Sequence, residues 1–175
     1  MIKFIFLHIF GWRIVGFTKL PKKCILIAAP HTHWVDFFLG LAIKYSINEN
    51  LKFLAKKELF FIPLNILMNY LGGIPVKRDS NTNTVDQISR FFNERNEFKL
   101  AISPEGTRKK VEKWKTGFYY IAKKSNIPII CISLNFLKKT VTFSNPYSLT
   151  KNKEKDFHKL KNNFKESIGK IPEYS

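Results

Sequence analysis

Residues 24–46 read CILIAAPHTHWVDFFLGLAIKYS, and this stretch decides the fold. An unbroken apolar run that stops at Pro30 is typical of a buried strand. After the proline the pattern becomes helical. The residues that share one face of the predicted helix are Val35, Phe38, Leu39, Ala42 and Ile43. The sequence therefore predicts that His31 lies at a strand-to-helix junction.

The same junction holds a candidate general base and a carboxylate to orient it. On one regular helix, residues five apart point about 140° away from each other, so His31 and Asp36 meet only if His31 is in the loop and Asp36 in the first turn. A neutral imidazole bonded to a carboxylate keeps one nitrogen available for a hydroxyl proton. His33 stands three residues before Asp36 and would share a helical face with it. Either histidine is also compatible with simply capping or packing the helix start.

Strand and helix signals alternate along the rest of the chain. Strands are predicted at 51–55, at 74–78, in FKLAISPEGTR (98–108), at 127–134 and at 140–144. Helices are predicted at 83–93, at 115–124 and in ELFFIPLNILMNYLGG (58–73), where Pro63 suits the first turn and Gly72-Gly73 the stop. No repeat or linker divides the chain. We expect an α/β fold in which residues 1–175 form a single domain with a mixed, largely parallel sheet flanked by helices.

The charge of the chain is one-sided. Its 175 residues include 30 Lys+Arg against 13 Asp+Glu, a net charge of +17, and 15% aromatic residues. Such a field attracts nucleic acid, anionic lipid, a phosphorylated substrate or an acidic carrier protein, and charge alone does not rank them. The two cysteines lie in apolar runs without disulfide or zinc spacing, which favours a reducing cytosolic setting.

Both ends of the chain carry membrane-like patterns. Residues 1–20 contain an apolar run too short to cross a bilayer, so the segment either lies in a membrane interface or packs a first helix on the core. The basic tail 151–175 has Phe157, Leu160, Phe164 and Ile168 at helical spacing. This stripe either packs on the domain with its lysines outward or binds anionic headgroups.

Two further motifs combine glycine with positive charge. In SPEGTRKK (103–110), Gly106 allows a tight turn, and Arg108 offers a planar fork of donors for a phosphate or carboxylate. Glu105 in that turn can pair with the arginine, bond a substrate hydroxyl or cap the turn. In GGIPVKRDS (72–80), a short strand delivers Lys77 and Arg78 to a loop. Each motif alone would more often be a solvated surface turn.

Together and in this order, four blocks resemble the glycerolipid acyltransferase family, in particular the bacterial enzymes that acylate lysophosphatidic acid. HTHWVD matches the family's histidine-four-residues-aspartate motif at His31 and Asp36. GGIPVKR matches the block that ends at Arg78, and SPEGTR matches the Pro-Glu-Gly-Thr-Arg block. IPII matches the short apolar block that carries Pro128. The family commonly has Asn before the histidine and Ser two residues after it, where this chain has Pro30 and His33.

The resemblance implies an O-acyltransferase of phospholipid biosynthesis with the family's α/β acyltransferase fold. It makes His31 the general base and Asp36 its partner. The substrate-binding residues that it implies are Arg78, Glu105, Gly106, Thr107, Arg108 and Pro128, with both arginines on the acceptor's phosphate. The donor would be an acyl thioester of coenzyme A or acyl carrier protein, and the acceptor a lysophospholipid, first of all 1-acyl-glycerol-3-phosphate. No cofactor, metal or nucleic acid is implied.

The resemblance also implies a peripheral or monotopic enzyme on the cytoplasmic side of the cell membrane. The apolar stretch 58–71 and the Phe-rich helix after His31 would then line an acyl channel, enter lipid or pack in the core. Two rival functions are an acyltransferase for an amine- or sugar-containing lipid and a basic nucleic-acid-binding module. The second lacks the usual nucleic-acid-binding signatures.

Overall fold

The computed structural model describes residues 3, 5–76 and 81–175, and within them builds one seven-stranded sheet in the order β1-β7-β6-β2-β5-β3-β4. The strands are β1 (Arg13–Val15), β2 (Lys23–Ala29), β3 (Leu51–Lys56), β4 (Gly73–Val76), β5 (Phe98–Ile102), β6 (Ile129–Asn135) and β7 (Thr140–Phe143). Neighbouring strands are parallel except for the antiparallel pair β6 and β7. The predicted mixed, largely parallel sheet is confirmed.

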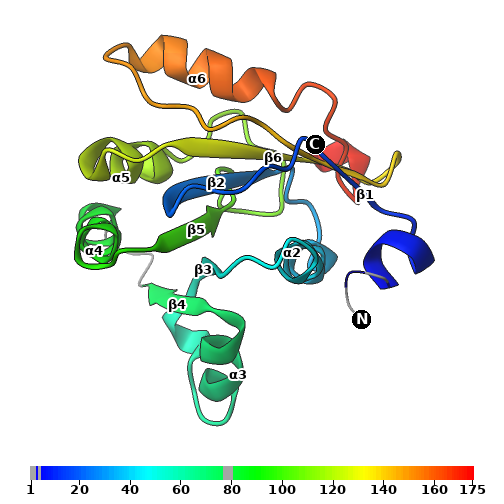
Figure 1. Cartoon of the computed structure of the whole chain (residues 1–175), viewed down its shortest axis with the longest axis horizontal. Helices are drawn as coiled ribbons and strands as arrows, with labels where there is room; N and C mark the ends of the chain where they lie inside the picture. The colour runs from blue at the N-terminus through cyan, green and yellow to red at the C-terminus, as the bar shows by residue number, and fades with distance from the viewer. Residues whose placement is uncertain (1–2, 4, 77–80) are drawn as a thin grey trace.

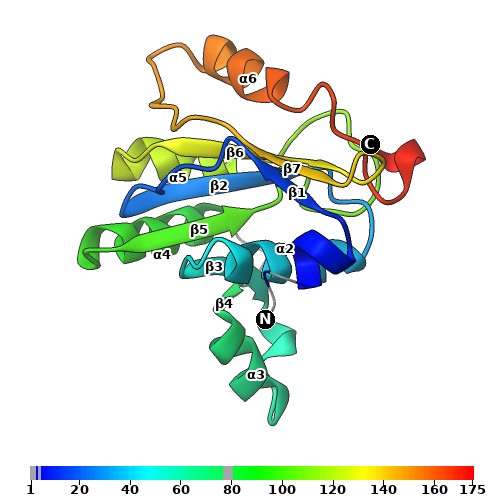
Figure 2. The same cartoon turned by 45° about the vertical axis from the view of Figure 1, so that its right-hand side comes forward.

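Helices cover both faces of the sheet (Figure 1). They are α2 (Val35–Ser46), α3 (Leu64–Leu71), α4 (Asn81–Glu94), α5 (Gly117–Ser125) and α6 (Lys153–Asn162), with short helical turns η1 (Ile5–Ile9), η2 (Lys57–Leu59) and η3 (Pro172–Tyr174). Helices α4 and α5 lie side by side on one face, and α2 and η1 lie on the other. Helix α3 projects away from the sheet in both orientations (Figure 2).

Alternating residues of β2 supply two separate apolar cores. Ile25 and Ile27 pack with α4, α5 and α6, whereas Cys24 and Leu26 pack with α2 and η1. All four of these side chains are fully buried. A strand buried on both faces needs the continuous apolar run that the sequence shows, because neither face meets water.

The register of the sheet brings several loops to one edge. Ile27 of β2 pairs with Ile102, the last residue of β5, and Ala29 pairs with Ser133 of β6. Lys56 at the end of β3 pairs with Val76 at the end of β4. In parallel sheets, ligands bind beyond the carboxyl ends of the strands. The loops after β2 and β5, which hold the HTHWVD and SPEGTR motifs, therefore meet at that edge.

Helix α2 buries a different face from the predicted one. Leu39 and Ile43 are buried as expected, but Phe38 is 56% exposed and Asp36 is buried instead. The helix is rotated toward Asp36 because that carboxylate turns inward to bond the loop before the helix.

The two chain ends also differ from a simple periodic interpretation. The stripe in the tail is not one helix, because α6 ends at Asn162 and Ile168 instead bridges to Asn135 as an extended segment. Its first half packs on the domain, one of the two alternatives that the sequence left open, since Leu160 is buried and Phe157 is half-buried. At the other end, Phe6 and Trp12 join the core while Ile9 and Phe10 stay exposed.

Strand β1 was not predicted at all. It is three residues long and has only one half-buried position, so it carries almost no apolar signal. Gly16 ends it with φ +69°, and a Cβ there would collide with the carbonyl oxygen of Phe143 in β7. Close backbone approach, rather than side-chain pattern, places this strand.

A buried carboxylate ties α6 to the domain. Asp156, with no exposed surface, accepts hydrogen bonds from the hydroxyls of Tyr119 (3.1 Å), Tyr147 (2.8 Å) and Thr150 (2.8 Å), and from the Thr150 backbone N–H (3.0 Å). Burial raises the pKa of Asp156, but these hydrogen bonds outweigh it and hold that pKa below its ordinary value. The ionised form is therefore stabilised by folding.

Replacing Asp156 with Asn is expected to lower the free energy of unfolding at pH 7 by about 2 to 4 kcal/mol, because two phenols and Thr150 lose a charged acceptor. Since the pKa is depressed in the folded state, this contribution is present above the unfolded-state pKa and lost as pH falls through the folded-state pKa. Urea unfolding at several pH values measures it. Glu166→Gln, whose ion pair with Lys138 is exposed, should change little. A wild type-to-variant difference independent of pH would contradict this account.

Candidate active site

The imidazole of His31 and the carboxylate of Asp36 meet at the carboxyl end of β2. The distance from His31 Nδ1 to Asp36 Oδ2 is 3.0 Å, with Asp36 almost fully buried and the His31 side chain 26% exposed. His31 lies in the loop and Asp36 in the first turn of α2, as the five-residue spacing requires. A bond through Nδ1 fixes the ring and leaves Nε2 as the nitrogen that can exchange a proton.

Asp36 also shapes the loop that carries the histidine. Its Oδ2 accepts the backbone N–H groups of Thr32 (2.7 Å) and His33 (2.8 Å) as well as the imidazole. Its Oδ1 is buried without a hydrogen-bond partner among the described residues. The carboxylate sits at the amino end of α2, where the helix dipole favours negative charge. One oxygen thus bonds the loop backbone and orients the His31 ring.

His33 does not compete for this carboxylate with its ring. The His33 Nδ1 accepts the backbone N–H of Val35 at 3.3 Å, and its ring contacts Trp34 at 5.3 Å between centroids. His33 therefore caps the start of α2, one of the two alternatives that the sequence left open.

Glu105 clamps the His31 loop from the loop after β5. The His31 backbone N–H donates to Glu105 Oε2 at 2.6 Å, and the Ser103 hydroxyl lies 3.5 Å from the same oxygen. Burial raises the pKa of Glu105, although the His31 N–H and the nearby imidazole oppose that shift. The two motifs, 74 residues apart, are joined by a short hydrogen bond in a partly buried place.

The chain end braces the same loop from behind. The buried Thr32 hydroxyl accepts the Ile171 backbone N–H at 3.1 Å. Gly169 lies so close that a Cβ there would be 2.5 Å from the Thr32 methyl group. Sequence reasoning missed this contact, since the only signal in the tail was its apolar stripe.

A cavity of about 1730 Å³ opens beside His31. Its apolar lining comes mainly from α2, β3 and α5, with single residues from η2 and α3, and includes Phe37, Phe38, Leu41, Phe53, Leu59, Met68, Phe118 and Ile121. Its cationic lining comes from Lys44, Lys52, Lys56, Arg108, Lys109, Lys115, Lys123 and Lys124. The cavity therefore offers apolar side chains to an aliphatic chain and cationic side chains to a phosphate. The lysines in this set were not distinguishable in the sequence from solvated surface lysines.

The other predicted residues divide into three groups. Gly106, Thr107 and Arg108 line the cavity together with His31 and Asp36. Arg78 lies outside the described residues. Pro128 is not brought to the site: it precedes β6 at the opposite edge of the sheet, where its carbonyl accepts the Ile25 N–H at 3.1 Å.

Comparison with protein-family models matches residues 12–135 to the family described as Acyltransferase, which is most of the chain. The chain belongs to the acyltransferase family. The matched range holds both strand-to-loop junctions of the site, at His31 and at Glu105. The resemblance noted from the four blocks is confirmed, and so is the coarser functional expectation that the protein is an acyltransferase.

Among solved structures, this acyltransferase is similar to the 1-acyl-sn-glycerophosphate (LPA) acyltransferase PlsC from Thermotoga maritima. The TM-score is 0.62 at 17% sequence identity, covering 94% of this chain and 75% of that one. At this identity the likeness shows the fold. Comparison with curated proteins found no match.

The acyltransferase site needs glycine at position 106. Gly106 has φ +65°, and a Cβ there would lie 2.7 Å from Lys115 Cδ. Gly106→Ala is expected to lower the free energy of unfolding by about 1 to 2 kcal/mol, because the left-handed backbone is costly for an L-residue. The matched control is Gly40→Ala inside α2, where an added Cβ would have no neighbouring atom within 4 Å outside its own helix turn. That change should raise stability by about 0.5 to 1 kcal/mol in thermal unfolding. Equal effects of the two substitutions would contradict the assignment.

Proposed function

We propose that this acyltransferase moves a fatty acyl group from an acyl thioester to a hydroxyl of a lysophospholipid. The leading candidate for this acceptor is 1-acyl-glycerol-3-phosphate. The observation that carries the proposal is the 3.0 Å contact between His31 and Asp36 beside a cavity with apolar and cationic walls. The coenzyme A or acyl carrier protein ester supplies an activated carbonyl, so a base and correct positioning are sufficient.

The transfer takes two proton steps through one imidazole. The acceptor hydroxyl attacks the thioester carbonyl carbon while His31 Nε2 takes its proton, and Asp36 stabilises the imidazolium through Nδ1–H. The tetrahedral intermediate then collapses, the carbon–sulfur bond breaks, and the imidazolium returns the proton to the leaving thiolate. The products are an ester and a free thiol, and the base is restored.

Charge on the cavity wall supports a phosphate-bearing acceptor. Arg108 follows the Gly106 turn, and Lys115 packs against that turn through its side chain. A guanidinium matches phosphate oxygens in pairs, and a nearby ammonium adds charge. The family resemblance adds Arg78 to this group. Glu105 is a positioning residue, since it accepts the His31 backbone N–H and so fixes the loop that carries the imidazole.

His31→Ala is expected to lower kcat by about 10² to 10⁴, since it removes the general base. Asp36→Asn should also lower kcat, and the double variant should be no slower than His31→Ala alone, because Asp36 acts on the chemistry through His31. Lipid mass spectrometry after incubation with acyl-CoA and lysophosphatidic acid measures product. The control is His158→Ala, an exposed histidine on α6. Equal product from wild type and His31→Ala would overturn the mechanism.

Arg108→Gln is expected to raise KM about tenfold for a phosphorylated acceptor and to leave KM for an unphosphorylated one unchanged, because only the first loses a charge-assisted hydrogen bond. Lys165→Gln, an exposed change outside the cavity lining, is the control. Steady-state assays with paired acceptors measure both constants. A loss shared by both acceptors would contradict a phosphate contact, and faster turnover of amine- or sugar-lipid acceptors would favour that alternative class.

A further inference from the structure

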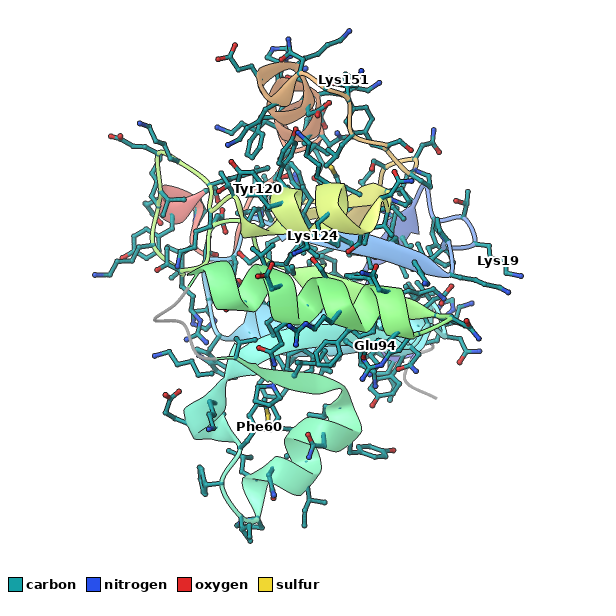
Figure 3. The ribbon with its side chains drawn as sticks, turned by 90° about the vertical axis from the view of Figure 1, so that its left-hand side faces the viewer. Lys19, Phe60, Glu94, Tyr120, Lys124 and Lys151 are labelled. Carbon is teal, nitrogen blue, oxygen red and sulfur yellow. The ribbon has the colours of Figure 1, made fainter. Side chains whose placement is uncertain are left out.

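An arm that is uncharged after its first two residues, Lys57 and Glu58, projects from the sheet between β3 and β4. We use "α3 arm" for residues 57–72, which comprise η2, the following turn and α3. The arm stands away from the body of the protein in every view (Figures 1, 2 and 3). From residue 59 to residue 76 the sequence holds no charged residue, although a quarter of the whole chain is charged.

The outer surface of the α3 arm is apolar. Within α3 itself only Met68 is buried. Its exposed large apolar residues are Leu59, Phe61, Ile62, Ile66, Leu67 and Tyr70, of which Ile62 is 82% and Tyr70 78% exposed. A patch of this kind costs solubility unless a partner covers it. Figure 3 shows the side chains of the arm, near Phe60 and below it, pointing outward as largely carbon sticks.

Positive charge gathers where the α3 arm joins the body. Lys44 donates to the carbonyl of Leu71 at 2.6 Å, and both Lys44 and Lys52 lie beside Gly72. Burial lowers the pKa of Lys44, and the charge of Lys52 lowers it further. Lys56 precedes the arm and Lys57 is its first residue, with Glu58 as the one opposing charge between residues 56 and 76 among the described residues.

An apolar tip above a cationic base matches an anionic bilayer. With eight residues, α3 is about 12 Å long, and no helix among the described residues is long and apolar enough to cross a membrane. A short element of this composition is suited to burial at the boundary of headgroups and acyl chains, where lysines at its base meet lipid phosphate.

The α3 arm is continuous with the active site. Leu59 and Met68 of the arm line the same cavity as His31. Between them, the ring of Phe53 packs on that of Phe37 at 5.3 Å, and both also line the cavity. Apolar residues of the arm, of β3 and of α2 therefore line the same cavity as the candidate base.

We propose that the α3 arm inserts its exposed apolar side chains into the interface of an anionic lipid bilayer and so places the cavity mouth at the membrane surface. The delivery of a lipid acceptor to His31 by this route rests on the proposed function. Binding of the arm to lipid does not, and it is measured without turnover.

The first experiment compares binding of full-length proteins to vesicles. The variant Ile62→Gln/Ile66→Gln/Tyr70→Gln changes three exposed residues that do not line the cavity. Its affinity for phosphatidylglycerol-rich vesicles should be at least about tenfold weaker than that of wild type, since three apolar side chains no longer insert. The control is Leu137→Gln in the turn between β6 and β7, where the Leu137 side chain is 78% exposed, and this variant should bind as wild type does. Pure phosphatidylcholine vesicles should bind wild type more weakly than anionic ones.

The second experiment reports insertion at one position. Cys24 and Cys131 are buried, which raises the pKa of each thiol to about 12 and leaves them unreactive toward thiol reagents. A single new thiol can thus be labelled with an environment-sensitive fluorophore. Label on Ile66→Cys should shift to the blue when anionic vesicles are added, and label on Leu137→Cys should not.

Three results would overturn the proposal. They are unchanged vesicle binding by the triple variant, absence of a blue shift at position 66, and a wild-type dimer that the triple variant dissolves in light scattering, which would make the arm an interface between copies. If wild type shows no acyl transfer yet the arm binds lipid as described, the proposed function fails and this inference stands. If acyl transfer to a detergent-dispersed acceptor survives while vesicle binding does not depend on the arm, the reverse holds.

Discussion

One carboxylate oxygen holds the centre of this molecule together. Oδ2 of Asp36 accepts the His31 imidazole and the backbone N–H groups of Thr32 and His33, all within 3.0 Å. Because the oxygen lies in the first turn of α2 while its donors lie in the loop after β2, it couples the direction of the helix to the conformation of the loop. The position of the His31 ring therefore depends on the conformation of the junction between β2 and α2.

Two distant segments then fix that loop from either side. Strand order puts β5 next to β2, so Glu105 reaches the His31 backbone, and the tail reaches Thr32 through Ile171. The loop is thus bonded from three parts of the chain. Such a support keeps a catalytic side chain in one orientation, and the open side of the site is left to substrate. The α3 arm departs from the same edge of the sheet, and Leu59 and Met68 of the arm line the cavity beside His31.

Expectations drawn from local pattern were accurate wherever burial was uniform. The strand before Pro30 is apolar from Cys24 to Ala29 because both its faces are covered, and the Gly72 stop follows from a φ of +97° that favours glycine. Pattern failed where one tertiary contact outweighed it. Phe38 was expected in the core, but α2 is rotated so that Asp36 is buried instead. Ile168 fits the helical spacing of the tail, yet it is extended and pairs with Asn135.

The sequence alone determined the order of strands and helices from β2 to β7, the loop position of His31 and its partner five residues on, since burial periodicity and helix geometry are local properties. Only the tertiary structure decided that Glu105 meets His31, that Pro128 sits at the far edge, and that several ordinary-looking lysines line one cavity. The physical reason is that strand order and register set which loops adjoin, and both arise from packing between segments that lie many residues apart.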